Sequence, residues 1–442
     1  MIVFSKLKHI LLLSIPIIGG MMSQNILNLV DTLMIGQLGH MALAGTGVGA
    51  FLFFVSFSGF TGIASGVQTM VARYVGQSQK DLISMALLLG IILSFIGSII
   101  VLIGQWLWLD NLIGLFSSEK EVLIVAEDYY RFRLLGLPFL TFCLVIRGFW
   151  NGLSDPKRYL AVIVLIHSLN VIFNYCFIFG KFGFPAMQAA GAGLASTLSL
   201  IIGAMIYGFD CRAYLKVCLL LNLSKDILKK ALKWLLNLGI PTSIQQFFFA
   251  LGVAVFYWLL GQLGTVEMAI GNVLVNIVLV GILPGVGLAM ATMTLVSQSL
   301  GEKKLVDMFY WPFYVSLLAV FGIGAMVLVA LIFPTIVLRP FILDDSVLQR
   351  AILPLRLDAI GVFFEVLALI FMHALNGIDR TRFVMVVSIV CQWLFLLPVA
   401  YCLAVVLGYG LEGAWLSWLF FQVIQLLVFF VTWFRLRRQF FT

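Results

Sequence analysis

Residues 10–39 read ILLLSIPIIGGMMSQNILNLVDTLMIGQLG, and Asp31 is the only charged side chain among them. Up to the glycine-containing turn at its end, this stretch is longer than the about 20 residues that an α-helix needs to cross a lipid bilayer. Inside a bilayer the backbone has no water to bond with, so a crossing segment must satisfy its own hydrogen bonds. We therefore expect a transmembrane helix here, at roughly 9–35.

Stretches of the same kind occur along the whole chain. Hydrophobic residues make up 62% of the 442 residues and charged residues 10%, against about 45–50% and about 25% in soluble domains. This composition excludes a soluble enzyme, a disordered chain and a nucleic-acid binder, because a soluble protein could not keep so much apolar surface from water. The sequence predicts an all-α integral membrane protein with twelve transmembrane helices, at roughly 9–35, 43–72, 84–109, 122–150, 158–180, 188–211, 230–260, 268–298, 308–335, 347–375, 383–407 and 411–434.

The basic residues indicate how these helices are oriented. Of the 27 Lys and Arg residues, nineteen fall in loops and ends on one side of the expected membrane, seven fall on the other, and Arg147 lies within a helix end. Cytoplasmic loops carry the excess of basic residues in membrane proteins. We therefore expect a multi-pass protein of the inner (plasma) membrane with both termini in the cytoplasm.

The chain repeats itself at a constant offset, without a gap from residue 15 to residue 152. Residues 36–39, GQLG, match residues 261–264, and at the same offset Asn151 matches Asn376. Six helices per repeat give both repeats the same orientation in the membrane, which is one of the architectures of secondary transporters. We expect two six-helix lobes around a central cleft: an N-terminal lobe at 1–211, a cytoplasmic linker at 212–233 and a C-terminal lobe at 234–442.

Asp31 is the strongest functional signal in the sequence. An ionisable group in a membrane helix costs about 2.5–3.5 kcal/mol on insertion scales, so such groups usually serve a transported ion or substrate. Gln24 and Asn28 precede Asp31 at a spacing of i, i+4 and i+7, which places the three side chains on one helix face.

The fifth expected helix carries a second polar face, formed by His167, Asn170 and Asn174 at i, i+3 and i+7. Asn174 lies at nearly the depth of Asp31, so the two faces could close on each other. A carboxylate with two amide oxygens suits a hard cation such as Na⁺, and the carboxylate could equally take a proton. The alternative is a structural cluster of hydrogen bonds that holds the helices together.

Glu365 is a second acid inside an expected helix, near the middle of the bilayer, and the repeat places Leu140 at its position in the first lobe. It could bind a cation or substrate, or make a packing contact between helices. Gln245, Asn272 and Asn276 are polar positions in the seventh and eighth helices that could line the cleft or bond between helices.

Several motifs are absent from the sequence. It contains no GxxxxGK[ST] phosphate-binding loop, no HExxH or GxSxG motif, and no Cys/His metal-binding spacing, and its six cysteines show no CxxC pattern. We therefore expect neither an enzyme nor a bound cofactor.

Residues 29–39, LVDTLMIGQLG, resemble the first-helix signature of the multidrug and toxic compound extrusion (MATE) family. Ile240-Pro241, the Asn-Gly turns at 151 and 376, and residues 294–301, TLVSQSLG, resemble it as well. The resemblance covers essentially the whole chain and rests on the order and spacing of these motifs. It implies export of bulky, usually cationic, amphiphilic compounds in exchange for Na⁺ or H⁺.

The resemblance also implies site residues. Glu365 falls where one branch of the family keeps an Asp, whereas Phe249 stands where that branch usually has Glu, so coupling is expected in the first lobe. Ser196 falls near a family Thr that helps to hold the cation. The expected coupling site consists of Asp31, Asn170, Asn174 and Ser196. The first three of these residues are also the expected ligands of a Na⁺ ion.

Together these observations predict a secondary antiporter that works by alternating access, as a monomer, on a small-molecule substrate. The expected substrate contacts are Gln24, Asn28, Gln245, Asn272, Asn276 and Glu365. One alternative is a flippase for lipid-linked saccharides, which would need a wide cationic cavity, whereas most basic residues here lie at the cytoplasmic rim. An intramembrane enzyme would need a catalytic constellation that the sequence lacks, and a sensor would not need an acid in a polar pocket.

Overall fold

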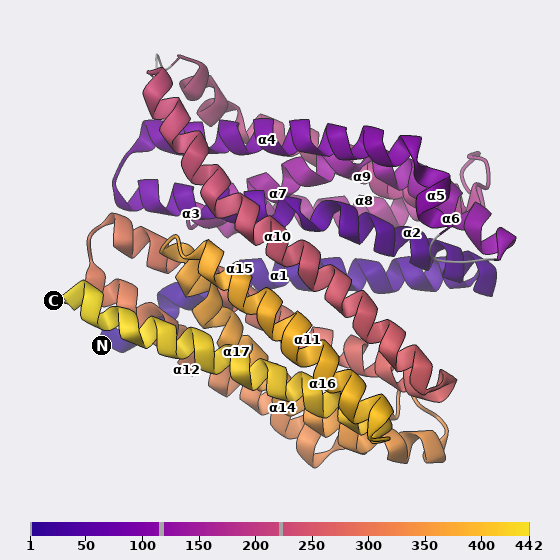
Figure 1. Cartoon of the computed structure of the whole chain (residues 1–442). Coiled ribbons are helices and arrows are strands. Elements are labelled where there is room, and N and C mark those ends of the chain that lie inside the picture. The colour runs from indigo at the N-terminus through magenta and orange to yellow at the C-terminus, as the bar shows by residue number, and fades with distance from the viewer. Residues whose placement is uncertain (1, 115–118, 221–223, 442) are drawn as a thin grey trace. The chain divides into compact units, whose positions relative to one another are not determined.

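The computed structural model describes residues 2–114, 119–220 and 224–441, and all the regular elements in these ranges are helices (Figure 1). The long apolar runs dictate this, because a helix satisfies its own backbone hydrogen bonds in lipid. In the first repeat the helices are α1 (Ile2–Gly36), α2 (His40–Ser58), α3 (Phe60–Gly76), α4 (Lys80–Leu107), α5 (Leu109–Ile113), α6 (Lys120–Leu135), α7 (Leu137–Gly152), α8 (Pro156–Phe179) and α9 (Gln188–Leu220).

The second repeat contains the same order of long helices, with π-helical segments near its end. Its elements are α10 (Lys225–Leu263), α11 (Thr265–Gly301), α12 (Leu305–Ile332), α13 (Pro334–Leu338), α14 (Asp345–Gly377), α15 (Thr381–Val390), the π-helix η1 (Cys391–Leu396), α16 (Leu397–Tyr401), the π-helix η2 (Cys402–Val406) and α17 (Gly410–Phe441).

The expected all-α membrane protein is confirmed. Within the described ranges, ten helical segments are long and apolar enough to cross a membrane, and α6 with α7, bent by 52°, make an eleventh. The remaining expected helix, at 347–375, coincides with α14. The expectation of one continuous helix at 122–150 differs from the structure, which breaks it at Gly136 between α6 and α7.

By their contacts, the residues form two units, Gly19–Gln246 and Met1–Ile18 with Phe247–Thr442. Each boundary lies inside a long helix, at Ile18 in α1 and at Gln246 in α10. The lobes expected from the sequence, at 1–211 and 234–442 with a linker at 212–233, kept α1 whole, and the boundary between the linker and the second lobe falls inside α10 at another point. In the structure the beginning of each helix packs with the other repeat, which hydropathy cannot reveal because it carries no information about which helices are in contact.

The internal repeat is visible in the backbone. Two glycines make matching close contacts: a Cβ atom at Gly62 would lie 2.4 Å from the Ser243 nitrogen, and one at Gly287 would lie 2.5 Å from Ile18 Cγ1. Gly287 corresponds to Gly62 in the repeat, as Ser243 corresponds to Ile18. Residues with positive φ in three turns recur at the same offset: Gly39 and Gly264, Ser78 and Lys303, and Ser154 and Asp379.

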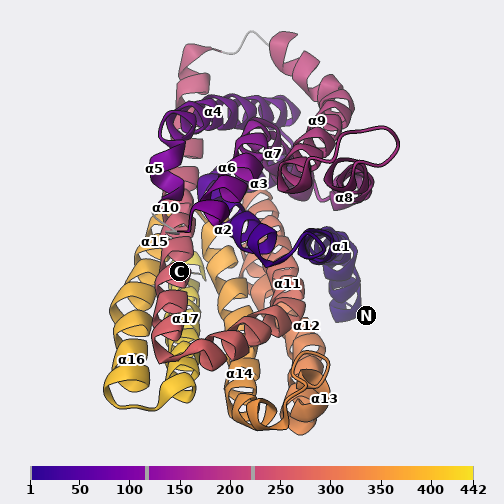
Figure 2. The ribbon, with the colours of Figure 1, turned by 90° about the vertical axis from the view of Figure 1, so that its right-hand side faces the viewer.

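Each unit has its own core. In Gly19–Gln246, α8 packs along α9 (Figure 2), and the side chains of Phe149, Trp150 and Tyr207 are fully buried. In the other unit α14 packs against both α11 and α17, and Phe256 and Trp415 belong to the core cluster. The packing of α14 on both sides explains why it holds buried polar side chains.

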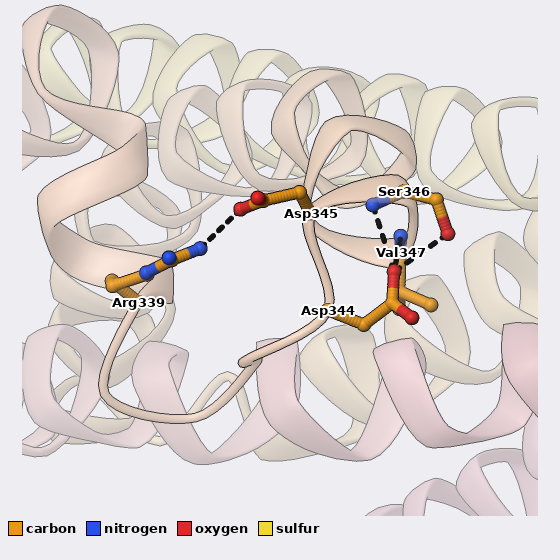
Figure 3. A network of polar contacts seen from close by, with 5 residues as sticks. All are labelled: Arg339, Asp344, Asp345, Ser346 and Val347. Atoms are coloured by element: carbon orange, nitrogen blue, oxygen red, sulfur yellow. Dashed lines mark hydrogen bonds and ion pairs between the residues drawn. The ribbon is translucent and has the colours of Figure 1, made fainter.

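The start of α14 is fixed by a polar network (Figure 3). Asp344 Oδ1 accepts hydrogen bonds from the backbone nitrogens of Ser346 (2.8 Å) and Val347 (3.2 Å) and from the Ser346 hydroxyl (2.6 Å). Arg339 pairs with Asp345 beside it. The hydrogen bonds from the Ser346 hydroxyl and the two backbone N–H groups lower the pKa of Asp344, because they favour its charged form.

Candidate functional site

The candidate site lies between α1 and α8. Pro156 opens α8 at its first turn, and Gly180 closes it in the left-handed conformation, so the helix spans the whole polar sequence between them. The helical period then places Asn170 and Asn174 one turn apart on the face that α1 approaches.

A chain of hydrogen bonds joins the four residues of the expected coupling site. Asn174 Nδ2 donates to Asp31 Oδ1 at 2.6 Å and to Asn170 Oδ1 at 2.8 Å. Asn170 Nδ2 in turn donates to Ser196 Oγ on α9 at 2.9 Å and, more weakly, to Ser199 Oγ at 3.4 Å. Three helices, α1, α8 and α9, therefore contribute to one polar cluster.

The cluster is buried and incompletely satisfied. Asn170, Asn174 and Ser196 are buried, whereas Asp31 is half-buried at the edge of the cluster. Asn174 Oδ1 has no hydrogen-bond partner in the described part of the chain. A buried amide oxygen without a partner is uncommon in proteins. Beside a carboxylate, it is an oxygen ligand that a hard cation could use.

The negative charge of Asp31 is not neutralised by an ion pair with a basic side chain of the described residues. Arg133 of α6 interacts with Asp31 electrostatically, but among the described residues Asp31 has no ion pair within 4 Å. The Arg133 guanidinium instead lies over the Phe53 ring, 4.6 Å from its centroid. Asp31 therefore remains available to a mobile cation or proton.

A second set of hydrogen bonds connects α1 and α8 two turns away. Ser23 Oγ lies 2.7 Å from His167 Nδ1, and His167 Nε2 lies 3.1 Å from Gln24 Oε1. Gln24 Nε2 donates to Asn28 Oδ1 at 3.1 Å. Because Gln24 Oε1 can only accept, His167 Nε2 carries the proton and the Ser23 hydroxyl donates to Nδ1 in the neutral ring. The two polar faces thus close on each other, with Gln24 and Asn28 on their exposed side.

The other expected substrate contacts are distributed over both units. Gln245 is buried in the unit that contains Asp31. Asn272 and Asn276 are exposed on α11 in the other unit, where Asn276 Nδ2 donates to the Asn272 carbonyl oxygen at 2.8 Å. Glu365 is buried in α14 of that second unit, beside Trp418 of α17.

Sequence reasoning missed one buried acid, Asp358, which is 4% exposed in α14. It precedes Glu365 by seven residues, so the two acids share a helix face, as Gln24 and Asp31 do. The spacing was present in the sequence, inside the helix expected at 347–375, and Glu365 alone was singled out there. Phe249, the departure from the family pattern, is exposed, and its carbonyl oxygen accepts from Gln392 Nε2 at 3.2 Å.

Within the described ranges, no group of three or more His, Cys, Asp or Glu side chains is placed to hold a metal ion. The cluster at Asp31 consists instead of one carboxylate with amide and hydroxyl oxygens. A lone carboxylate held by amides between membrane helices is typical of secondary transport proteins, in which such groups lie on ion and substrate pathways.

Comparison with known proteins identifies the family. The MatE family model matches residues 16–176 and 241–402, one match in each repeat, and the chain belongs to this family, the multidrug and toxic compound extrusion proteins. The two matched segments start at Pro16 and Pro241, which correspond to each other in the internal repeat.

Relatives of known name align with nearly the whole chain. It is 26% identical over 422 residues to a probable multidrug resistance protein NorM of Thermotoga maritima, covering 93% of this chain and 88% of that protein. It is 27% identical over 448 residues to a probable multidrug resistance protein NorM of Mannheimia succiniciproducens, covering 98% and 94%. Both relatives are named as multidrug resistance proteins.

Solved structures have the same fold. An outward-facing multidrug resistance MATE family transporter of the MOP superfamily matches with a TM-score of 0.88 at 23% identity, covering 98% of this chain and 96% of that one. A MOP superfamily transporter from Pyrococcus furiosus matches with a TM-score of 0.86 at 23% identity and the same coverage. The expected MATE fold is therefore confirmed.

Proposed function

We propose that the protein is a secondary antiporter of the plasma membrane that exports amphiphilic, mostly cationic compounds in exchange for Na⁺ or H⁺. The observation that carries this proposal is the buried chain from Asp31 through Asn174 and Asn170 to Ser196, with Asn174 Oδ1 left without a partner. The MatE match and the names of the NorM relatives support the drug-like substrate class.

Asp31 is the residue at which the coupling ion binds. A Na⁺ ion would take the Asp31 carboxylate, Asn174 Oδ1 and further oxygens of Asn170 and Ser196, whereas a proton would need the Asp31 carboxyl alone. In either case the added positive charge removes an uncompensated negative charge from membrane depth, which is costly to keep there. Binding of the ion therefore favours the arrangement in which Asp31 is enclosed.

The exchange cycle follows from competition between the two positive ligands. The substrate is attracted by the same negative region, and its contacts are Gln24, Asn28, Gln245, Asn272, Asn276 and Glu365. If the ion favours one arrangement of the protein and the substrate favours the other, each drives the release of the other. We propose that a monomer completes this cycle, with both termini in the cytoplasm as the positions of the basic residues indicate.

The test is exchange in liposomes that contain the purified protein. A fluorescent organic cation should be expelled when a Na⁺ or pH gradient is imposed, and Asp31→Asn should lower the rate by about 5–150-fold, the range of typical coupling energies. Asp128→Asn is the matched control, because Asp128 is an exposed acid of the same unit. Normal exchange by Asp31→Asn would refute the assignment, and movement of lipid-linked saccharides without dye efflux would favour the flippase.

A further inference from the structure

The second unit contains two buried acids that the Asp31 cluster does not use. Asp358 is 4% exposed and Glu365 is 7% exposed, and both lie on α14. Seven residues are two helical turns, so the two side chains share a face and are separated by about 10 Å along the helix axis.

The neighbours of these acids are aromatic. On α17, which packs along α14 (Figure 1), Trp415 lies beside Asp358 and Trp418 lies beside Glu365. The Phe256 ring of α10 contacts both indoles, with centroid distances of 5.6 Å to Trp415 and 5.1 Å to Trp418. The side chains beside the two carboxyl groups therefore supply indole N–H groups and ring faces.

The polar contact of Asp358 is weak. Asp358 Oδ2 and Trp415 Nε1 are both buried and face each other, but they do not reach the geometry of a well-formed hydrogen bond. Trp415 itself is only 3% exposed. One loose contact with an indole N–H cannot compensate a buried carboxylate, because a buried charge needs a counter-charge or several hydrogen bonds.

No base compensates these acids. Among the described residues neither Asp358 nor Glu365 has an ion pair within 4 Å, and Arg350, at the outer end of α14, is paired with Glu267 of α11. Arg356 is exposed, two residues from Asp358 and thus on another side of the helix. Asp358 interacts electrostatically with Glu365 and with Tyr257 of α10, and neither of these groups carries a positive charge.

The side chains around Asp358 and Glu365 favour a proton over a metal cation as the bound species. A metal cation needs several oxygen ligands around it, but the two carboxyl groups are two turns apart and their neighbours are indoles. A proton needs only one carboxyl oxygen and removes the charge that burial penalises. We propose that Asp358 is a proton-binding site of the second unit, separate from Asp31. Its carboxylate takes up a proton while it is enclosed beside Trp415, and it gives this proton to water when water reaches the carboxyl group.

The proposal goes beyond coupling at Asp31 and does not depend on it, so the test uses no substrate and no gradient. Infrared spectra of the full-length protein in lipid nanodiscs at pH 7 should contain the carbonyl band of a protonated carboxyl group. Asp358→Asn should remove one component of this band, and Glu365→Gln should shift the Asp358 component because the neighbouring carboxyl is replaced. Asp344→Asn, at an exposed acid of the same unit, should leave the band unchanged.

Three outcomes would overturn the proposal. The first is a wild-type spectrum at pH 7 without a protonated-carboxyl band, which decides the matter even if Asp358→Asn does not fold. The second is an identical band in wild type and a folded Asp358→Asn variant. The third is loss of the Asp358 component on addition of Na⁺ at constant pH, which would make the site a metal site.

Discussion

The interface of α1 with α8 differs in chemistry from its counterpart in the second repeat. At the offset that relates Asn151 to Asn376, Asp31 corresponds to Phe256 and Gln24 corresponds to Phe249. Asp31 bonds to an amide in a polar cluster, whereas Phe256 packs against Trp415 in an aromatic core. The duplication therefore preserved the helices, while the polar cluster between these two helices occurs in the first repeat.

The hydrogen bonds across the two interfaces differ in the kind of acceptor that they use. In the first repeat His167 bonds to the side chains of Ser23 and Gln24. Its counterpart Gln392 donates to the Phe249 carbonyl oxygen, and Trp393 Nε1 donates to the Phe248 carbonyl oxygen at 3.3 Å. Where the partner side chains are phenyl rings, only backbone carbonyl oxygens are left to accept these hydrogen bonds. Two π-helical segments, η1 and η2, also interrupt this part of the second repeat.

The acids inside the membrane helices also lie at different positions in the two repeats. Asp358 occupies the position that Arg133 has in the first repeat, and Glu365 occupies that of Leu140. The first repeat thus has its acid on its first helix and a base on α6, and the second has both acids on α14. The acid of the first repeat therefore has amide and hydroxyl groups around it, whereas the acids of the second repeat have indoles beside them.

The largest expected effect comes from emptying the aromatic core of the second repeat. Phe256→Ala should destabilise the protein by about 3–5 kcal/mol, because it removes a buried ring that contacts two indoles. Thermal unfolding followed by tryptophan fluorescence measures this. Phe434→Ala is the control, since that side chain is 50% exposed, and it should change stability little. Equal stability of the two variants would show that Phe256 does not fill a core.

The next effect is on transport and concerns the polar interface. Asn174→Ala removes the donor to Asp31 and the unpartnered oxygen, so dye exchange in liposomes should slow by about 5–150-fold. Any stabilisation of the protein by the coupling cation should also be lost in Asn174→Ala. Asn111→Ala, an exposed asparagine of the same unit, is the control. Wild-type exchange and wild-type cation stabilisation in Asn174→Ala would place the coupling site elsewhere.

A smaller effect distinguishes the two interfaces directly. His167→Leu leaves the polar groups of Ser23 and Gln24 without a partner and should cost about 1–3 kcal/mol. Gln392→Leu removes one bond to a carbonyl oxygen that also serves its helix, and should cost about 0.5–1.5 kcal/mol. Comparison of the two midpoints of thermal unfolding tests the order. A larger loss in Gln392→Leu would mean that the second interface depends on its polar contact more than the first.

The smallest effect concerns the starts of α14 and α6, which correspond in the repeat. Asp344 caps α14 with its side chain, whereas the side chain of Glu119 does not cap α6. Because its hydrogen bonds lower the pKa of Asp344, this carboxylate stabilises the folded state above the ordinary value of 3.8 and the contribution disappears as the pH falls through the lowered pKa.

The melting temperatures of wild type and Asp344→Ala should therefore differ slightly at neutral pH and converge in acid. Ser346→Ala should reproduce part of the difference, since the Ser346 hydroxyl is one of the donors. A difference that persists unchanged in strongly acidic solution would show that the carboxylate is not the stabilising group.

Much of the fold and part of the site could be predicted without coordinates. The helical period alone placed Asn170 and Asn174 on one face and Asp31 on another, and the structure brings the two faces together. The contact with Ser196 came only from the family resemblance, because nothing in periodicity relates α8 to α9. Asp358 was overlooked, and its burial depends on the packing of α14, which the sequence does not show.

The sequence by itself determined the class of protein, the helices and the repeat, because a lipid environment allows an apolar chain few structures other than helices. Tertiary structure alone decided which polar atoms are left without partners, as at Asn174, which acids are buried, as at Asp358, and which part of α1 and α10 packs with which repeat. These properties depend on distances between side chains that are far apart in the sequence, and hydropathy and spacing carry no information about such distances.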